Sequence, residues 1–279
     1  MKDINLTIRD AGRIKGISAT LLAGEPGVGK THTAELLARY WEDYDPNGPV
    51  KQIFFQLYNG VEKEKLLYDY HLPNMVNAMA FKEGSASTHP VLLEGVLYQA
   101  ARSSLTQKTV LVLDELDKGG EDIDILLLDF LQNGRLSDPM FGEVKVNFKN
   151  IIVVITSNEQ RELNDALYRR LRYIRLQYPD KDKQLRIIKS MDPASFEELG
   201  KHKVELLIDL SMLYRKKEDV ERKVVVNQLA RLVADLVVLR HNRDHVKESI
   251  CQWFSPNEQD WTILTNIREF DKFVDAVAK

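Results

Sequence analysis

Short runs of apolar, mostly β-branched residues recur through the first two-thirds of the chain. Four of them are strong and the last is weaker: residues 20–23, 53–57, 109–113, 151–155 and 172–176. Since they are short and do not alternate with polar residues, they predict strands buried on both faces of a sheet. Stretches with helical periodicity, such as 33–39 and 123–130, lie between them. This alternation predicts an α/β fold in which helices flank a parallel five-stranded sheet.

The pattern changes after Pro179, where the strand signals stop. Helical periodicity follows at residues 183–191, 196–214 and 226–240. A proline and a capping aspartate at 178–180 mark a turn of the chain before a helix. We therefore expect an α/β domain over residues 1–179, a small helical domain over 180–240, and a tail over 241–279 that the sequence does not assign.

A long gap separates the second and third predicted strands. It runs from about residue 58 to residue 108 and contains Pro73, Gly84 and Pro90 between helix-like pieces. Because these residues interrupt helices, the gap is predicted to hold an insertion rather than one helix.

The charge and cysteine content exclude several classes of protein. The chain has 39 basic and 42 acidic side chains, and its formal charge of −3 gives no bulk attraction to nucleic acid or anionic lipid. A single cysteine, Cys251, excludes an intrachain disulfide framework. No apolar stretch approaches the roughly 18 residues of a membrane span, and the start has no apolar signal core. We expect a cytoplasmic globular protein without a membrane span.

A glycine-rich segment follows the first predicted strand and fits the pattern G-x-x-x-x-G-K-[ST]. Its residues are Gly24, Glu25, Pro26, Gly27, Val28, Gly29, Lys30 and Thr31. In this pattern backbone N–H groups surround phosphates, the lysine reaches the β- and γ-phosphates, and the hydroxyl binds Mg²⁺. The strand before the segment and the helix after it provide the context that the pattern requires. The segment therefore predicts a site for ATP with Mg²⁺.

Two carboxylates, Asp114 and Glu115, end the third predicted strand. An aspartate in this position can hold Mg²⁺ beside the threonine hydroxyl, directly or through water. The glutamate points to the other side of the strand end and can orient and deprotonate a water molecule. The pair therefore indicates hydrolysis rather than metal binding alone. Three further acids, Asp117, Asp122 and Asp124, lie at a loop and a helix start, where we expect them to cap.

Asn158 follows the fourth predicted strand, and Arg169 and Arg170 follow farther along the chain. If the sheet places this strand between the first and the third, Asn158 lies near the γ-phosphate and the attacking water. The alternative is a turn residue that closes the strand. The arginines are either a finger inserted into a neighbouring subunit's nucleotide or a solvated helix end. An arginine finger raises the rate of hydrolysis by a factor of about 10³–10⁵, so a hydrolysis assay separates these two roles.

The order of these motifs resembles the AAA+ ATPase module, and within that superfamily it looks most like the MoxR-type ATPases. The resemblance extends from about Ile4 to Arg240 and rests on residues 22–31, 55–61, 111–118 and 156–167. The last stretch is the most specific because it joins the sensor asparagine to the arginine-finger helix.

The resemblance implies a sheet in the order 5-1-4-3-2, followed by a helical lid. It also implies a ring, usually hexameric, in which a neighbour's arginine completes each nucleotide site. An insertion interrupts the helix after the second strand in this family, which accounts for the gap at 58–108. Family members often work with a von Willebrand factor A domain partner and act as chaperones that remodel proteins or help insert metals.

Two positions depart from the family's pattern. The family often carries three arginines in the finger helix, but the first position here is Tyr168, so Arg169 and Arg170 are both candidates. The lid normally supplies a sensor-2 basic residue at the start of a helix. After a helix start at Asn227, the nearest candidate is Arg231, for which a packing or surface role is the alternative.

These inferences lead to one main hypothesis, a Mg²⁺-dependent ATPase that couples hydrolysis to the remodelling of a protein client. The first alternative is an AAA+ motor or switch that acts with nucleic acid or in a defence system; the near-neutral charge argues against nucleic acid. The others are a phosphotransferase and a slowly hydrolysing, nucleotide-gated scaffold. The paired acids favour water over a phosphate acceptor.

Overall fold

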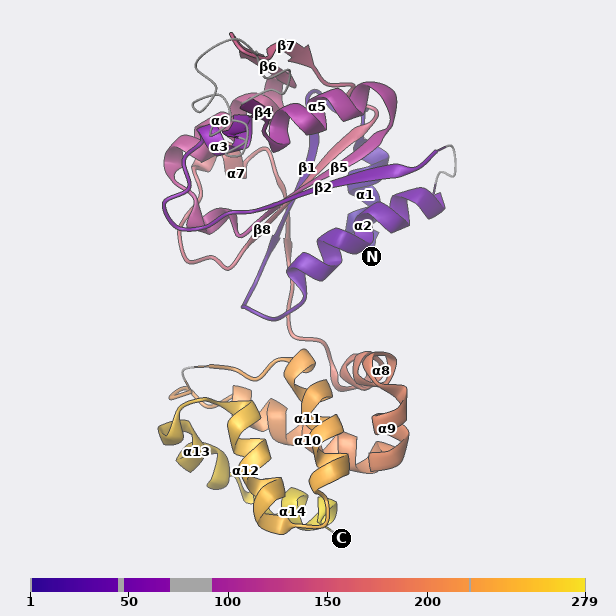
Figure 1. Cartoon of the computed structure of the whole chain (residues 1–279), viewed down its shortest axis with the longest axis vertical. Helices are drawn as coiled ribbons and strands as arrows, with labels where there is room; N and C mark the ends of the chain where they lie inside the picture. Colours follow the sequence, from indigo (N-terminus) through magenta and orange to yellow (C-terminus); the bar gives the residue numbers. More distant parts are fainter. Residues whose placement is uncertain (1, 45–47, 71–91, 221, 279) are drawn as a thin grey trace, which may run out of the picture. The chain divides into compact units, whose positions relative to one another are not determined.

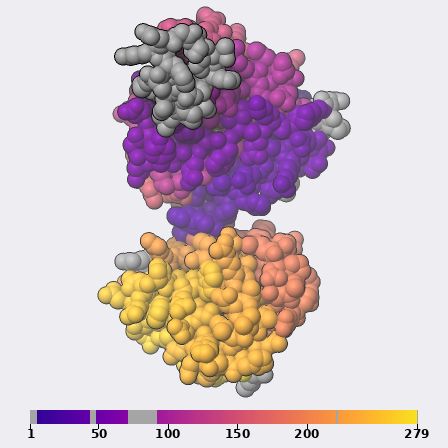
Figure 2. All heavy atoms as spheres, in the orientation of Figure 1, coloured from indigo at the N-terminus to yellow at the C-terminus, as the bar shows by residue number. Residues whose placement is uncertain are grey.

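The structure is a computed structural model that describes residues 2–44, 48–70, 92–220 and 222–278. The chain divides into two compact units, Met1–Gln177 and Tyr178–Lys279. Figure 1 shows a mixed unit of strands and helices and a second unit of helices alone. Each unit encloses its own hydrophobic core, and Figure 2 shows the atoms at the surface of each unit on one side.

The first unit contains a five-stranded sheet in the order β2-β5-β8-β1-β9. The strands are β1 (Ser18–Ala23), β2 (Val50–Gln56), β5 (Lys108–Asp114), β8 (Ile151–Ser157) and β9 (Arg172–Arg175). Every neighbouring pair in the sheet is parallel. Each apolar run therefore contributes to one strand, and the predicted α/β fold with its 5-1-4-3-2 strand order is confirmed.

Helices cover both faces of this sheet and make three layers (Figure 1). One face is covered by α1 (Lys2–Asp10) and α2 (Lys30–Tyr44), and the other by α5 (Val96–Thr106) and α6 (Glu121–Asn133). Successive residues of β5 point to opposite faces. Val110 and Val112 accordingly belong to the core beneath α2, whereas Leu111 and Leu113 belong to the core beneath α5 and α6. Burial on both faces explains the continuous apolar runs of β1, β5 and β8. For the edge strands the same prediction was wrong, because β2 buries only Ile53 and β9 buries none of its residues.

The sheet brings the ends of distant segments to one edge. The last residue of β1, Ala23, pairs with Ser157 at the end of β8, and Gln56 at the end of β2 pairs with Asp114. Because all these strands are parallel, their carboxyl ends lie at the same edge of the sheet. The loops that follow the strands therefore meet there.

Two small hairpins interrupt the α/β pattern. In the first, β3 (Tyr68–Tyr70) pairs antiparallel with β4 (Leu92–Glu94), between a one-turn helix α3 (Glu64–Leu67) and α5. It lies in the predicted insertion at 58–108; Pro73, Gly84 and Pro90 lie outside the described residues. The second hairpin joins β6 (Arg135–Asp138) to β7 (Gly142–Lys145) and was not predicted. These strands have four residues each and bury only one residue each, so they leave little signal in the sequence.

The second unit consists of helices in its described part. They are α8 (Lys181–Met191), α9 (Pro193–Leu199), α10 (Lys201–Arg215), α11 (Val226–Leu239), α12 (Arg243–Phe254), α13 (Glu258–Thr265) and α14 (Arg268–Val277). The helical periodicity over 196–214 corresponds to two helices, because the chain breaks at Gly200 with a φ of +91°. None of the helices within the described ranges is both long and apolar enough to cross a bilayer.

Residues 241–279, which the sequence did not assign, contain all of α12, α13 and α14. Phe254, Phe270 and Phe273 from these helices are buried in the same core as Leu207 of α10 and Leu232 of α11. The spacing of the buried residues in α14 gives that helix one apolar face. This part of the chain therefore completes the second core and is not an appendage to it.

A stability prediction follows from Gly95, the residue before α5. Its N–H donates to the Leu67 carbonyl at 2.8 Å, and a Cβ here would overlap the backbone of Leu66 and Leu67. Gly95→Ala should therefore lower the free energy of unfolding by about 2–3 kcal/mol, because overpacking against backbone cannot relax through a rotamer change. Chemical denaturation monitored by circular dichroism measures this loss.

Gly142→Ala is the matched control. Its Cβ would meet no atom within 4 Å, and its φ of +73° imposes only the left-handed backbone penalty, about 1–2 kcal/mol. A loss for Gly95→Ala that is smaller than that of the control would contradict the close approach of α3 and α5.

Candidate functional site

The glycine-rich segment forms the turn between β1 and α2. The φ angles of Gly24, Gly27 and Gly29 are +146°, +77° and +93°, which L side chains rarely adopt. A Cβ at Gly24 would also overlap the carbonyl oxygen of Leu176. Glycine at these positions lets the turn close tightly ahead of the N-terminus of α2. The positive end of the helix dipole and its unpaired N–H groups make this end of α2 suitable for an anion.

Lys30 is the first residue of α2, and only 6% of its surface is exposed. Its ammonium donates to the carbonyl oxygens of Gly24 and Glu25 at 2.7 and 2.9 Å. Burial lowers the pKa of Lys30, and the nearby carboxylates, Asp117 first among them, partly oppose that shift. The side chain thus lies folded against the turn, where its charge faces the same region as the helix N-terminus.

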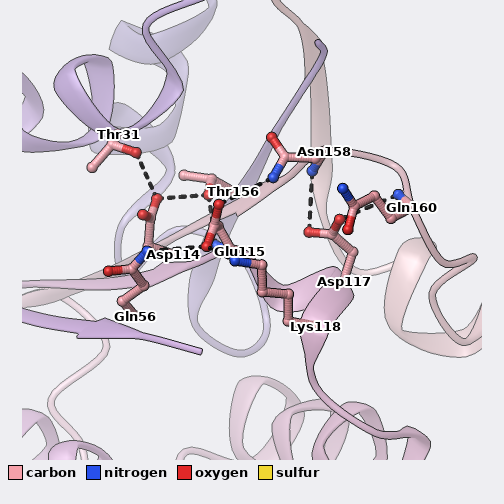
Figure 3. A network of polar contacts seen from close by, with 9 residues as sticks. All are labelled: Thr31, Gln56, Asp114, Glu115, Asp117, Lys118, Thr156, Asn158 and Gln160. Atoms are coloured by element: carbon pink, nitrogen blue, oxygen red, sulfur yellow. Dashed lines mark hydrogen bonds and ion pairs between the residues drawn. The ribbon is translucent and has the colours of Figure 1, made fainter. Parts of the chain in front are cut away.

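Asp114, at the end of β5, connects three elements of the site. One of its oxygens, Oδ1, accepts hydrogen bonds from the hydroxyls of Thr31 at 2.8 Å and Thr156 at 2.7 Å (Figure 3). The Asp114 residue is 4% exposed. Carboxylate and hydroxyl oxygens are the ligands that Mg²⁺ prefers, and protein sites usually supply one or two of them beside substrate phosphates. The Thr31–Asp114 pair therefore fits Mg²⁺ bound together with a nucleotide.

Glu115 adopts left-handed backbone angles, with φ of 59° and ψ of 50°. Its N–H donates to the Thr156 hydroxyl at 2.9 Å, which holds the backbone in this turn. Its carboxylate accepts hydrogen bonds from Gln56 at 3.0 Å, Lys118 at 2.6 Å and Asn158 at 3.2 Å (Figure 3). Burial raises the pKa of the Glu115 carboxyl, but these three donors, led by Lys118, outweigh it and the net pKa is lowered. Glu115 is therefore held as a carboxylate.

Asn158 lies directly after β8, which the sheet places between β1 and β5, as the hypothesis for this residue required. Its side chain contacts Glu115, and its N–H donates to Asp117 Oδ1 at 3.1 Å. The other oxygen of Asp117 accepts from the N–H of Gln160 at 3.2 Å. The prediction that Asp117 caps a helix was wrong, because its carboxylate holds the loop after β8.

Asp124 also has a role other than capping. Helix α6 has Gly120 as its N-cap, and Asp124 lies farther along it with no exposed surface. Its two oxygens accept from the guanidinium of Arg161 at 2.8 and 2.9 Å. One of them also accepts from the N–H of Asn164 at 2.9 Å. The capping prediction was therefore wrong for Asp124 as well, since short-range sequence context does not reveal a partner 37 residues away.

Arg169 and Arg170 follow α7 (Asp165–Tyr168), and both are exposed. Neither forms an ion pair within the described ranges of the chain. Other arginines in this region do: Arg161 pairs with Asp124, Arg172 with Asp10 and Arg175 with Glu159. The two predicted finger residues thus present guanidinium groups to the surface.

Comparison with known proteins places this geometry in a family. The family profile described as "AAA domain (dynein-related subfamily)" matches residues 19–171, more than half of the 279-residue chain. The chain belongs to the dynein-related AAA subfamily. The matched residues include the glycine-rich turn, both strand-end carboxylates and Asn158 of this AAA domain. Membership indicates a nucleotide-binding protein of the ATPase type.

Three curated relatives are at most 30% identical to the chain. Over 218 residues the chain is 26% identical to a protein named chaperone protein ClpC1, chloroplastic, from Arabidopsis thaliana, a match that covers 78% of this chain and 21% of the relative. It is 30% identical over 146 residues to a probable chaperone protein ClpB 1 of Chlorobaculum tepidum, a match that covers 51% of this chain and 28% of the relative. A Lon protease of Finegoldia magna is 23% identical to the chain over 267 residues, a match that covers 90% of this chain and 31% of the relative. The matched parts span about a fifth to a third of these relatives.

Arg231 belongs to the second unit of the AAA protein. It lies on α11 with an exposed side chain. Its role as the sensor-2 residue stays a prediction. The structure also gives no geometric reason to prefer Arg169 over Arg170, since both are exposed beside the same short helix.

Sequence reasoning missed three polar groups of the AAA site. Gln56 ends the edge strand β2, Lys118 follows the acid pair in the one-turn helix η1 (Leu116–Lys118), and Thr156 lies inside β8. For Gln56 a signal existed, because a polar residue at the carboxyl end of a neighbouring parallel strand is expected at the same edge. The sequence gives no signal that Thr156 belongs to the site, since threonine is common in strands.

Thr156 provides a test of the site's geometry. The residue is fully buried, and its hydroxyl both donates to Asp114 and accepts from the N–H of Glu115. Thr156→Val keeps the shape but leaves the N–H of Glu115 without its acceptor and removes one of the two hydrogen bonds to Asp114 Oδ1, so the free energy of unfolding should fall by about 1–3 kcal/mol. Thr156→Ser keeps the hydroxyl and is the control. An equal loss in both variants, measured by chemical denaturation, would contradict the bridging role.

Proposed function

We propose that this AAA protein is a MoxR-like, Mg²⁺-dependent ATPase that works as a ring and remodels a protein partner. The observation that carries the proposal is the continuous set of contacts from Thr31 through Asp114 and Thr156 to Glu115 and Asn158. It unites a phosphate-binding turn, a metal-binding pair, a base and a sensor in one AAA site. A structural cluster without a reaction would not need an exposed turn that accepts anions beside it.

The substrate side of the site is proposed to be the glycine-rich turn and the N-terminus of α2. Backbone N–H groups of residues 27–31 bind the phosphates, and Lys30 turns from its carbonyl partners to the β- and γ-phosphates. Thr31 and Asp114 would hold Mg²⁺. When bound there, Mg²⁺ neutralises phosphate charge as the transferred group leaves.

Glu115 is proposed as the base that orients a water molecule and accepts its proton. Its lowered pKa keeps it ionised near neutral pH, and Asn158 links it to the region of the γ-phosphate. Gln56 and Lys118 donate to one oxygen of the Glu115 carboxylate, and Asn158 donates to the other, Oε1. A carboxylate oxygen has two lone pairs, so Oε1 can accept from a water molecule as well as from Asn158.

The neighbouring subunit is proposed to complete the site with Arg169 or Arg170. Both arginines are exposed, whereas Arg161 and Arg172 are partly buried and paired with carboxylates. An arginine that reaches a neighbour's γ-phosphate stabilises the negative charge of the transition state. A head-to-tail interface of this kind repeats around a closed ring, for which we propose a hexamer.

The client is proposed to be a protein. Relatives with detectable identity include proteins named as chaperones. A von Willebrand factor A domain protein is the partner that we propose from the MoxR resemblance, and the cytoplasm is the proposed location. Pull-down with a hydrolysis-deficient variant in the ATP state would identify the partner.

Glu115→Gln should retain ATP binding and lower the turnover number by about 10²–10⁴, because the amide accepts no proton from water. Binding is measured with a fluorescent ATP analogue, and turnover by release of inorganic phosphate. Glu35→Gln, an exposed site on α2, is the control and should keep the wild-type rate. Wild-type turnover by Glu115→Gln would exclude this residue as the base.

Replacing both Arg169 and Arg170 by alanine should lower turnover by about 10³–10⁵ without loss of ATP binding. Turnover per subunit of the wild type should rise with protein concentration, since each site needs two chains. The single variants identify which arginine acts, and Arg13→Ala is the exposed control. Constant turnover per subunit from a verified monomer would exclude a shared site.

A further inference from the structure

The loop between β8 and α7, residues 158–164, joins two parts of the proposed reaction. It begins at Asn158, beside Glu115, and ends at the helix that precedes Arg169 and Arg170. In the proposed ring, the first end serves the subunit's own nucleotide and the second serves its neighbour's. Two buried carboxylates, Asp117 and Asp124, hold the loop against the same unit.

Asp117 holds only the beginning of the loop. It is 6% exposed, and its two oxygens accept the backbone N–H groups of Asn158 and Gln160. It lies in η1, two residues after Glu115. Hydrogen bonds to loop positions 158 and 160 fix where Asn158 leaves β8, and therefore the direction in which its side chain reaches Glu115 (Figure 3).

Asp124 holds only the end of the loop. It receives two hydrogen bonds from Arg161 and one from the N–H of Asn164. Arg161 adds a bond to the carbonyl of Glu162 at 2.9 Å, so the guanidinium and the carboxylate together fix four residues of chain. A charge-assisted bidentate pair of this kind is short and directional.

The fixed end of the loop determines how α7 begins. Asn164 is the N-cap of α7, and its side chain accepts from the N–H of Ala166 at 2.9 Å. Leu167 anchors the inner face of this one-turn helix in the core. A helix this short has little stability of its own. The direction of Arg169 and Arg170 therefore depends on Asn164 and, through it, on Asp124.

We propose that these two carboxylates are positioning residues with separate tasks: Asp117 places the sensor for the subunit's own nucleotide, and Asp124 places the arginine finger for the neighbour's. The inference rests on the proposed shared-site ATPase. The two acids share no hydrogen-bond partner, so each task can be removed alone.

Mixed rings test this division. Glu115→Gln subunits lack a base but carry an intact finger, and Arg169→Ala/Arg170→Ala subunits lack a finger but carry an intact base. Mixed 1:1 before assembly, complementary variants should recover about a quarter of the wild-type rate, because random mixing joins the two working halves at about one head-to-tail interface in four. This pair is the control for the shared site.

Asp124→Asn alone should lower turnover at least tenfold with unchanged binding of the fluorescent ATP analogue. Mixed with Glu115→Gln it should recover about a quarter of the wild-type rate, and mixed with the arginine double variant it should recover none. Asp117→Asn should show the reverse pattern, with rescue by the arginine double variant alone. A purely structural role would produce no such dependence on the partner.

Some variants can fail to fold, since Asp124→Asn leaves a buried guanidinium without its charge partner. If the melting temperature falls well below that of the wild type, Asp124→Leu with Arg161→Met replaces it, and Asp117→Ser replaces Asp117→Asn. The inference is overturned if the arginine double variant rescues the Asp124 variant, or if neither partner rescues it. Provided that the control pair is active, the proposed shared site still stands in that case. An inactive control pair overturns the shared site, and the inference with it.

Discussion

The hydroxyl of Thr156 is the contact on which the geometry of the site depends. It donates to Asp114 and accepts from the N–H of Glu115, so one group from β8 fixes both the proposed metal ligand and the backbone of the proposed base on β5. The left-handed turn at Glu115 is costly for a residue with a side chain. It persists because the buried hydroxyl satisfies the N–H that this turn presents. Strand pairing thus sets the position of the acids, and Thr156 sets their orientation.

Charge is distributed over the site in a way that suits an anion. Lys30 and Lys118 lie among Asp114, Glu115 and Asp117. Lys118 is bonded to Glu115 at 2.6 Å, whereas Lys30 donates to two backbone carbonyls. The two lysine side chains therefore differ in how readily they can turn to a bound phosphate. Lys118 is committed to the base, whereas Lys30 gives up two neutral acceptors when a phosphate arrives. Charge-assisted bonds are stronger than neutral ones, which favours that exchange.

Much of the fold was predictable because the parallel sheet is buried on both faces. That burial forces continuous apolar runs such as 109–113 and 151–155, and the pattern of the phosphate-binding turn then identifies the strand that precedes it. The β6–β7 hairpin was not predictable, since a four-residue strand that buries one side chain has no period to detect. The break at Gly200 was hidden because a glycine inside a helical pattern is also compatible with a continuous helix.

The site was predictable where its chemistry follows a local pattern and unpredictable where it depends on pairing across the sheet. Asp114, Glu115 and Asn158 end strands, so the edge at which they meet follows from topology. Asp117 and Asp124 were assigned to capping because the sequence near them resembles a helix start. Only the fold brings residues 158–164 against them.

The placement of Asp117 and Asp124 has a consequence for how a ring could be coupled. Both residues follow Glu115 in one short segment of chain, η1 and the start of α6, and both hold the loop that leads to the finger helix. A displacement of this segment would therefore move both ends of the loop. The cores beneath α6 are close-packed, so such a movement shifts the segment as a unit instead of dissipating along it. In the proposed ring, a subunit's own nucleotide state would in this way reach the arginine that we propose it presents to its neighbour.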